Sequence, residues 1–127
     1  MNDTSPDAEL RLPADSAYLA VLRTATAGLA ARINFTLDDI EDLRIAVDEA
    51  CAILLPQARA QTDLECRFWL GQATMTVAVS VPSDNPKPPA EQGFAWRVLT
   101  ALTTFATSDI VDDKLVLTLS RSAGQHP

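Results

Sequence analysis

Histidine and cysteine are scarce in this sequence, and both shortages exclude a class of site. Its 127 residues include one histidine and two cysteines. The histidine, His126, lies in the terminal segment "RSAGQHP", which we expect to be frayed, so a histidine-based catalytic mechanism is effectively excluded. Cys51 and Cys66 lie in apolar patterns without the spacing of metal ligands. We therefore interpret them as buried free thiols and expect no metal site.

Basic residues and long hydrophobic runs are also in short supply. Lys and Arg number 10 against 17 Asp and Glu, which gives a net charge of −7. Clustered basic residues provide affinity for phosphates, so we expect no direct nucleic-acid partner, and a basic protein surface is a better match. No apolar run approaches the roughly 20 residues of a membrane span, and the start "MNDTSPDAEL" is acidic, unlike a secretory signal. These features predict a cytoplasmic protein without a membrane segment, where disulfides are rare.

The length and the 47% hydrophobic content predict one domain over residues 1–127, with residues 1–7 and 122–127 frayed. Apolar spacing predicts helices over residues 16–33, 37–56 and 94–106. Alternating or β-rich segments predict strands over 8–13, 63–71, 73–82 and 114–121, and four prolines between Pro82 and Gln92 predict a loop. This order predicts an α/β sandwich, in which a mixed, mostly antiparallel sheet of four to five strands is covered on one face by three helices.

One acidic residue in the second predicted helix is out of place. The segment "IEDLRIAVDEACAILL", Ile40 to Leu55, has a complete stripe of core residues. Glu49 lies nearly opposite that stripe, among apolar residues where a plain surface helix would carry polar ones. We therefore expect a second covered face, against a ligand, a second chain or a loop. The stripe consists of Ile40, Leu43, Val47, Ala50, Cys51 and Leu54, and the residues around Glu49 are Ile45, Ala46, Ala52 and Ile53.

Three segments, "YLAVLR", "FTLDDIEDLRIAVDEAC" and "GFAWRVLTAL", resemble the RsbW-type anti-sigma factors, the partner-switching serine kinases of the histidine-kinase-like ATPase superfamily. The resemblance covers about Leu10 to Arg121, is strongest over Tyr18 to Cys51, and is closest in the third segment to a divergent actinobacterial branch. It implies the sandwich fold and ATP bound between the helices and a lid. It also implies a homodimer that holds a stress or development sigma factor inactive and phosphorylates a small STAS-type anti-anti-sigma protein on serine.

The same resemblance indicates a degenerate nucleotide site. It places Glu49 at the catalytic base and Ile53 at the asparagine that binds magnesium, and a hydrocarbon offers no lone pair to that cation. Asp84 corresponds loosely to the aspartate that binds adenine, but prolines replace the glycines expected after it. Gly93 is the one glycine kept from the lid motif, and the bulky Phe94 follows it. We therefore expect neither ATP nor magnesium as a cofactor, the alternative being a kinase that uses both.

Glu49 and Arg23 each allow more than one interpretation. Glu49 is a half-exposed helix acid, a relic of an ancestral site, or a working base. Arg23 is either a solvated arginine or, as the resemblance implies and as we favour, a contact for both the sigma factor and the anti-anti-sigma protein. Its helix face is otherwise short of charge, so we expect it to have few partners within the chain.

Two further groups of residues have a structural and a functional interpretation. The acidic cluster near the start of the second helix is interpreted as a charge bias toward the helix N-terminus, with complementarity to a basic sigma surface as the alternative. We expect Phe94 and Trp96 to be core residues in preference to interface anchors. The acidic cluster comprises Asp38, Asp39, Glu41 and Asp42.

Three functions are compatible with these features. The first, which we favour, is an anti-sigma factor that sequesters its sigma factor by surface contact without nucleotide and is released by partner switching. The second is an active ATP-dependent serine kinase that retains activity through Glu49. The third is an anti-sigma factor whose former pocket senses another small molecule. We expect a homodimer that pairs at the sheet edge near Leu10 to Leu12 and the adjoining first helix.

Overall fold

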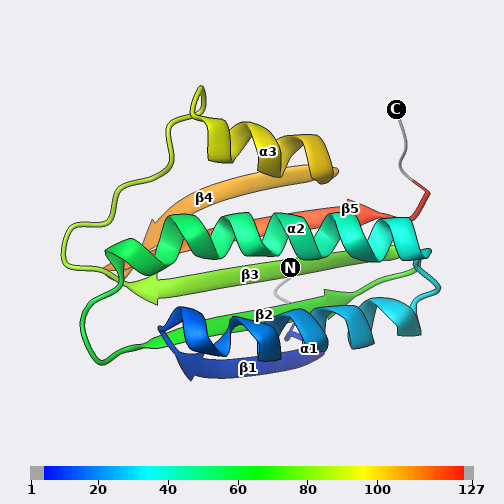
Figure 1. Ribbon diagram of the computed structural model, residues 1–127, viewed down its shortest axis with the longest axis horizontal. Coiled ribbons are helices and arrows are strands. Elements are labelled where there is room, and N and C mark those ends of the chain that lie inside the picture. Colours follow the sequence, from blue (N-terminus) through cyan, green and yellow to red (C-terminus); the bar gives the residue numbers. More distant parts are fainter. Residues whose placement is uncertain (1–4, 125–127) are drawn as a thin grey trace.

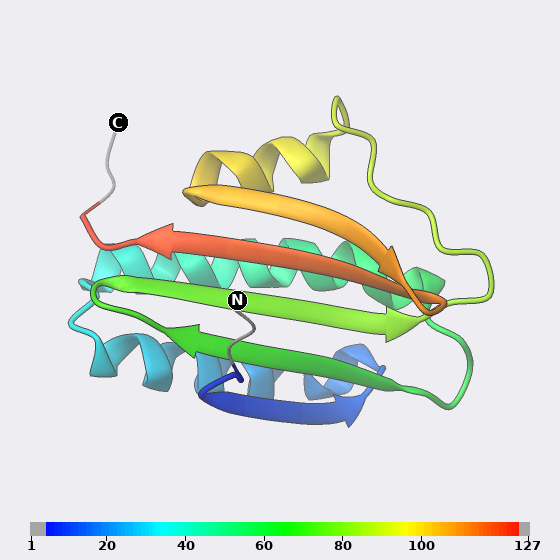
Figure 2. The same ribbon diagram turned by 180° about the vertical axis from the view of Figure 1, so that it is seen from behind.

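The computed structural model describes residues 5–124, which form one antiparallel sheet with helices on one face (Figure 1). His126 and the outermost residues of the segments expected to be frayed lie outside this range. The strand order is β1-β2-β3-β5-β4, and Figure 2 shows the uncovered face of the sheet. The sandwich with three α-helices on one face is confirmed. The strands are β1 (Ala8–Pro13), β2 (Asp63–Leu70), β3 (Thr74–Pro82), β4 (Phe105–Val111) and β5 (Lys114–Ser122).

The helices follow the predicted segments closely, and the start of α2 is capped by side chains. The α-helices are α1 (Leu19–Arg32), α2 (Leu37–Leu54) and α3 (Phe94–Leu102), and short 3-10 helices precede α1 (Ser16–Tyr18) and follow α2 (Leu55–Gln57). Thr36 caps α2: its hydroxyl oxygen accepts a hydrogen bond from the Asp39 N–H at 3.1 Å, and the Asp39 carboxylate accepts one from the Thr36 N–H. This reciprocal capping box fixes where α2 begins.

The third predicted helix was wrong in its last turn. It was expected to reach Ala106, but α3 ends at Leu102, and Thr103 is already extended (φ −129°, ψ 161°). The chain then forms β4, which returns to β5 through the two-residue turn Asp112-Asp113, where both φ angles are positive (51° and 64°). This turn matches the twist of a β-hairpin. Pairing with β5 therefore overrides the helical spacing, and the sheet gains a fifth strand, with every pair antiparallel.

The core lies between the sheet and the helices and is centred on α2. Ala46, predicted to lie beside Glu49 on the outer side of α2, is fully buried, whereas Ile40 is only half-buried. The buried arc of α2 is therefore rotated from the predicted stripe, because α2 packs between α1 and α3 as well as on the sheet. Cys51 and Cys66 are buried free thiols, as predicted. Among residues 5–124, no helix is long and apolar enough to cross a membrane.

Candidate functional site: the α2–α3 face and the α1 surface

Glu49 and Ile53 lie on the side of α2 that faces α3. Asp42, seven residues before Glu49, shares that side because seven residues make almost two helical turns. The contacts of Arg121 show that this side faces α3. Its guanidinium bonds to the Asp42 carboxylate (3.1 Å) and donates to the carbonyl of Leu102, the last residue of α3 (2.7 Å). Figure 1 shows α3 running antiparallel to α2, so the C-terminal part of α2, which carries Glu49 and Ile53, lies toward the start of α3.

The two side chains offer different chemistry to anything bound there. Glu49 is half-buried and forms no hydrogen bond or ion pair with any described residue, so its carboxylate can accept from an incoming donor. Ile53, one turn further along α2, is half-buried and packs against the hydrophobic core. Within residues 5–124, no group of three or more His, Cys, Asp or Glu side chains is arranged to hold a metal ion.

Asp84 lies in the proline-rich loop, which is anchored to the end of α2. Its exposed carboxylate accepts a hydrogen bond from Arg59 Nε at 2.7 Å. The side-chain amide of Gln57 pairs with the backbone of Lys87, donating to its carbonyl (3.0 Å) and accepting from its N–H (2.8 Å). Asp84 is therefore engaged with a cation. The hollow beside it has a volume of about 390 Å³ and is lined by residues 57–60, 83–85 and Lys87.

Gly93 caps the start of α3, and its backbone N–H is already used. That N–H donates to the Ala90 carbonyl at 2.9 Å, and a Cβ at position 93 would lie 3.1 Å from the same oxygen. A larger residue there would require the Ala90 backbone to shift by a few tenths of an ångström, so this close approach favours glycine. The interpretation of Phe94 as a core residue was wrong, because it is 82% exposed, whereas Trp96 is half-buried and packs against the core.

Arg23 lies on the opposite side of α2, on α1, and has a partner within the chain. Its Nε donates to both carboxylate oxygens of Asp48 on α2, at 2.8 and 3.0 Å. Asp48 is its single partner among residues 5–124, in agreement with the expectation of few intramolecular partners. The α1–α2 packing brings this carboxylate opposite the arginine. The two terminal nitrogens of the guanidinium form no hydrogen bond with a described residue, and they remain able to donate to another protein. Tyr18 and Val21 are also exposed, but they lie on another side of this helical segment, about 140° and 160° around it from Arg23.

A buried ion-pair cluster around Arg121 was not predicted. The Arg121 guanidinium bonds to the Asp39 carboxylate at 3.0 Å, and the Asp39 carboxylate also accepts from the Gly124 N–H at 3.2 Å. Burial alone would raise the pKa of Asp39, but hydrogen bonds from Arg121, Gly124 and Thr36 outweigh it and lower the pKa to about 2. The strand alternation of β5, which places Arg121 on the same face as Leu119, was the signal in the sequence.

This cluster changes the interpretation of the acidic residues at the start of α2. Asp38 and Asp39 lie in the first helical turn, in agreement with the expected charge bias. Asp39 is fully buried, so it contributes nothing to a surface that a sigma factor could contact. Asp38 and Glu41 are exposed, and Glu41 pairs with Arg44 at 3.4 Å.

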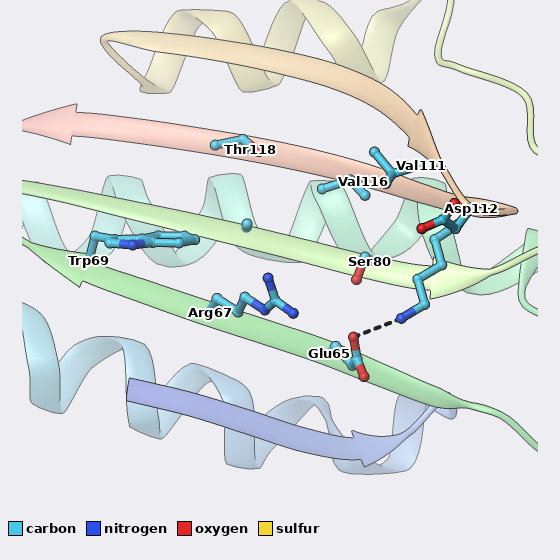
Figure 3. A pocket seen from close by; sticks show the side chains of 10 residues that line it. Glu65, Arg67, Trp69, Ser80, Val111, Asp112, Val116 and Thr118 are labelled. Atoms are coloured by element: carbon cyan, nitrogen blue, oxygen red, sulfur yellow. Dashed lines mark hydrogen bonds and ion pairs between the residues drawn. The ribbon is translucent and has the colours of Figure 1, made fainter. Parts of the chain in front are cut away.

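The uncovered face of the sheet carries a hollow of about 410 Å³ (Figure 3). Strand alternation places Glu65, Arg67 and Trp69 of β2 there, and Lys114 closes one end by bonding to Glu65 at 3.2 Å. Arg11 of β1 bonds to the other oxygen of the same carboxylate at 2.8 Å. This hollow lies across the sheet from Glu49, so it is separate from the α2–α3 face.

The five-stranded antiparallel sheet with three α-helices on one face defines an α+β sandwich of the histidine-kinase-like ATPase class. The sequence model of the histidine kinase-like ATPase domain matches residues 12–104, and the chain belongs to this family. It is 34% identical over 80 residues to the serine-protein kinase RsbW of Bacillus velezensis, a match that covers 61% of this chain and 50% of that protein.

A second match is to the serine-protein kinase RsbW of Bacillus thuringiensis, with 44% identity over 50 residues. It covers 39% of this chain and 31% of that protein. The RsbW protein of Bacillus cereus gives the same values. The matched part therefore spans half or less of each relative. The resemblance to RsbW-type proteins is confirmed.

Proposed function

We propose that this protein is an anti-sigma factor that holds an alternative sigma factor inactive by surface contact. Partner switching with a STAS-type anti-anti-sigma protein would release the sigma factor. The family match and the similarity to RsbW proteins support this proposal, as does the net charge of −7, which suits a basic partner surface. The α1 surface around Arg23 is where we place the contact, because its guanidinium is partly exposed and its two terminal nitrogens retain free donors.

We further propose that the nucleotide site is degenerate and that the protein works without ATP and magnesium. The observation that carries this proposal is Ile53, which packs against the core one helical turn after Glu49. Magnesium requires oxygen ligands in octahedral geometry, and an isoleucine provides none. The side chain of Asp84 is held by Arg59, and the N–H of Gly93 is held by Ala90. The residues present therefore do not fit a magnesium–ATP site, and no phosphoryl-transfer step is derived for them.

The alternative function is an ATP-dependent serine kinase acting on an anti-anti-sigma protein. Two observations favour it: the relatives are named serine-protein kinases, and Glu49 is half-buried with no partner among the described residues. A carboxylate in that position could take the proton of an attacking serine hydroxyl. Glu49 alone supplies no ligand set for the metal that would hold the phosphates.

Calorimetric titration of the purified protein with magnesium–ATP separates the two functions. We expect no binding heat at millimolar nucleotide, and we expect tight binding to one member of a panel of purified alternative sigma factors from the source organism. Saturable nucleotide binding, followed by transfer of labelled phosphate to an anti-anti-sigma protein, would establish the kinase instead. Failure to bind any sigma factor of the complete panel would count against the anti-sigma proposal itself.

We also propose that the protein is a homodimer in the cytoplasm. The unpaired outer edges of a small sheet support the dimer, because natural proteins usually cover or protect such edges. From the sequence, this contact was expected at β1, near Leu10 to Leu12, and at the adjoining first helix. The two edges of the sheet, β1 and β4, differ in how well they suit a second chain.

A further inference from the structure

β4 is an edge strand that exposes apolar side chains on both of its faces. Within residues 5–124, β4 pairs with β5 on one side, and no strand pairs with its other side. Figure 2 shows it along the outer margin of the sheet, with α3 behind it and extending beyond its outer side. Phe105 and Val111 project on the uncovered face of the sheet and Ile110 on the helical face, and each is about half-exposed. An edge of this kind is a template for pairing with another strand.

The sequence of β4 also lacks the proline and lysine residues that commonly protect edge strands. Its sequence, FATSDIV, contains no proline and no lysine and carries a single charge, Asp109. β1, at the opposite edge, carries Glu9, Arg11 and Pro13 within six residues. Charged side chains and proline discourage strand addition, because a proline cannot donate a ladder hydrogen bond. Of the two edges, β4 is therefore the better one for a partner strand.

The hydrogen-bond pattern of the sheet fixes which backbone groups of β4 point outward. The Ser83 N–H donates to the Asp113 carbonyl across the β3–β5 pair, so odd-numbered residues at this end of β5 bond toward β3 and even-numbered residues toward β4. Their partners on β4, Thr107 and Asp109, therefore direct their backbone groups inward. The free donors and acceptors belong to the alternate residues Ala106, Ser108 and Ile110.

A second copy of β4 is complementary to this edge in one antiparallel register. With the two-fold axis at Ser108, Phe105 faces Val111 of the second copy, and Thr107 faces Asp109, to which its hydroxyl can donate. Ala106 and Ile110 face each other in the same way, and all outward backbone groups are paired. Cross-strand pairs of these kinds stabilise antiparallel strands.

The two neighbouring β4–β4 registers give less favourable cross-strand pairs. An axis at Asp109 would place two carboxylates directly opposite each other, which is destabilising. An axis at Thr107 would place Phe105 opposite Asp109 and leave Val111 beyond the paired region.

We propose that β4 pairs with β4 of a second copy of this chain, so that two five-stranded sheets join into one continuous sheet. This inference rests on the homodimer of the proposed function and assigns its interface to β4 instead of β1. It is independent of sigma-factor binding. A single pair of seven-residue strands is small compared with standard interfaces, so we expect dissociation in the micromolar range.

Sedimentation equilibrium on the full chain, without sigma factor or nucleotide, tests the proposal. Ile110→Lys places a charge in the proposed β4–β4 interface. Val21→Lys on α1 is its matched control, because the two parent side chains are 49% and 47% exposed. We expect the wild type and Val21→Lys to dimerise alike, and Ile110→Lys to raise the dimer dissociation constant about tenfold or more. Both parent side chains are exposed, so both variants should keep the native fold, which circular dichroism checks.

Cysteine cross-linking tests the register. A Thr107→Cys chain mixed with an Asp109→Cys chain should form a mixed disulfide dimer, whereas Glu9→Cys mixed with Arg11→Cys on β1 should not. A wild type that stays monomeric at several hundred micromolar would overturn the proposal. So would a dimer that Val21→Lys disrupts and Ile110→Lys does not, or cross-linking at β1 without cross-linking at β4. The first outcome would leave sigma-factor binding untouched, so it is distinguishable from failure of the anti-sigma function.

Discussion

Arg121 at the end of β5 and Asp39 in the first turn of α2 form a buried ion pair, with 3.0 Å between guanidinium nitrogen and carboxylate oxygen. Their side chains are 2% and 0% exposed. Because Arg121 also bonds to Asp42 and to the last carbonyl of α3, one side chain joins the sheet to two helices. Removing either partner would leave an uncompensated charge in the core, which is costly.

Asp39→Asn should lower the free energy of unfolding by about 3 kcal/mol at pH 7, because it leaves the buried guanidinium without its main counter-charge. The folded-state pKa of Asp39, about 2, lies below the ordinary value of 3.8. The carboxylate therefore contributes stability that is complete above pH 3.8 and is lost as the pH falls through 2. The difference in the free energy of unfolding between wild type and Asp39→Asn should narrow by about 2 kcal/mol as the pH falls from 5 to 2. Urea denaturation across this range measures it.

Asp38→Asn is the control for that experiment. Asp38 occupies the same helical turn but is exposed, so its substitution should change stability by less than about 0.5 kcal/mol at either pH. A difference between wild type and Asp39→Asn that stays constant with pH would show that the Asp39 carboxylate is not stabilised by ionisation.

Arg23→Ala should weaken sigma-factor binding about tenfold or more while the protein melts almost normally. Truncating an interface charge typically costs about 2 kcal/mol or more of binding energy. The side chains of the Arg23–Asp48 ion pair are 40% and 35% exposed, so solvent screens the pair and its loss should lower stability by no more than about 1 kcal/mol. Surface plasmon resonance at moderate salt gives the affinity, and differential scanning calorimetry gives the melting temperature.

Two variants separate contact from packing at this position. Asp48→Asn removes the intramolecular partner and keeps the guanidinium, so sigma binding should persist. Arg32→Ala removes an exposed arginine from the last turn of the same helix and should have no effect on binding. Unchanged affinity in Arg23→Ala would exclude Arg23 from the interface.

Much of the fold was predictable, because local patterns and tertiary packing agree over most of the chain. The capped start of α2 at Thr36 and the alternation of β2 and β3 are properties of short segments, and the structure follows them. β4 was not predictable in the same way. Its residues continue the apolar spacing of α3, and only the hairpin with β5, closed by Asp112 and Asp113, makes a strand more favourable.

The candidate site was likewise predictable where local spacing determines it, and not where distant residues pair. Helical spacing correctly placed Glu49 and Ile53 on one side of α2. The pairing of Arg23 with Asp48 and of Asp39 with Arg121 joins residues far apart in the sequence, and nothing local indicates such partners. Phe94 is a further case: its spacing fits a core stripe, but it lies at the start of α3 beyond the packed region.

Cys51 and Cys66 should resist thiol reagents in the native protein. Burial raises the pKa of both thiols to about 12, so at pH 8 only about one in ten thousand is ionised. The thiolate is the reactive form, and both side chains are inaccessible. Ellman's reagent should label neither cysteine at pH 8 in native buffer and both in urea, while an added exposed thiol, Ser16→Cys, should react at once. Rapid native labelling of either parent cysteine would indicate frequent local opening of the core.

Ile53→Asn alone should not create a kinase. The substitution restores an oxygen ligand one turn after Glu49, but phosphoryl transfer depends on positioning the phosphates as well as on the metal. The backbone N–H of Gly93 already donates to Ala90, and one carboxylate oxygen of Asp84 is paired with Arg59, so binding a nucleotide would first require breaking these bonds. Incubation with labelled ATP, magnesium and an anti-anti-sigma protein should therefore give no phosphoserine, both for this variant and for the wild type.

Glu49→Gln should leave sigma-factor affinity unchanged within about twofold. Position 49 lies across α2 from Arg23, and the neutral amide of glutamine keeps the shape of the glutamate side chain. Phosphate transfer by Ile53→Asn that Glu49→Gln abolishes would instead show that one substitution had disabled a working active site, and that Glu49 is its base.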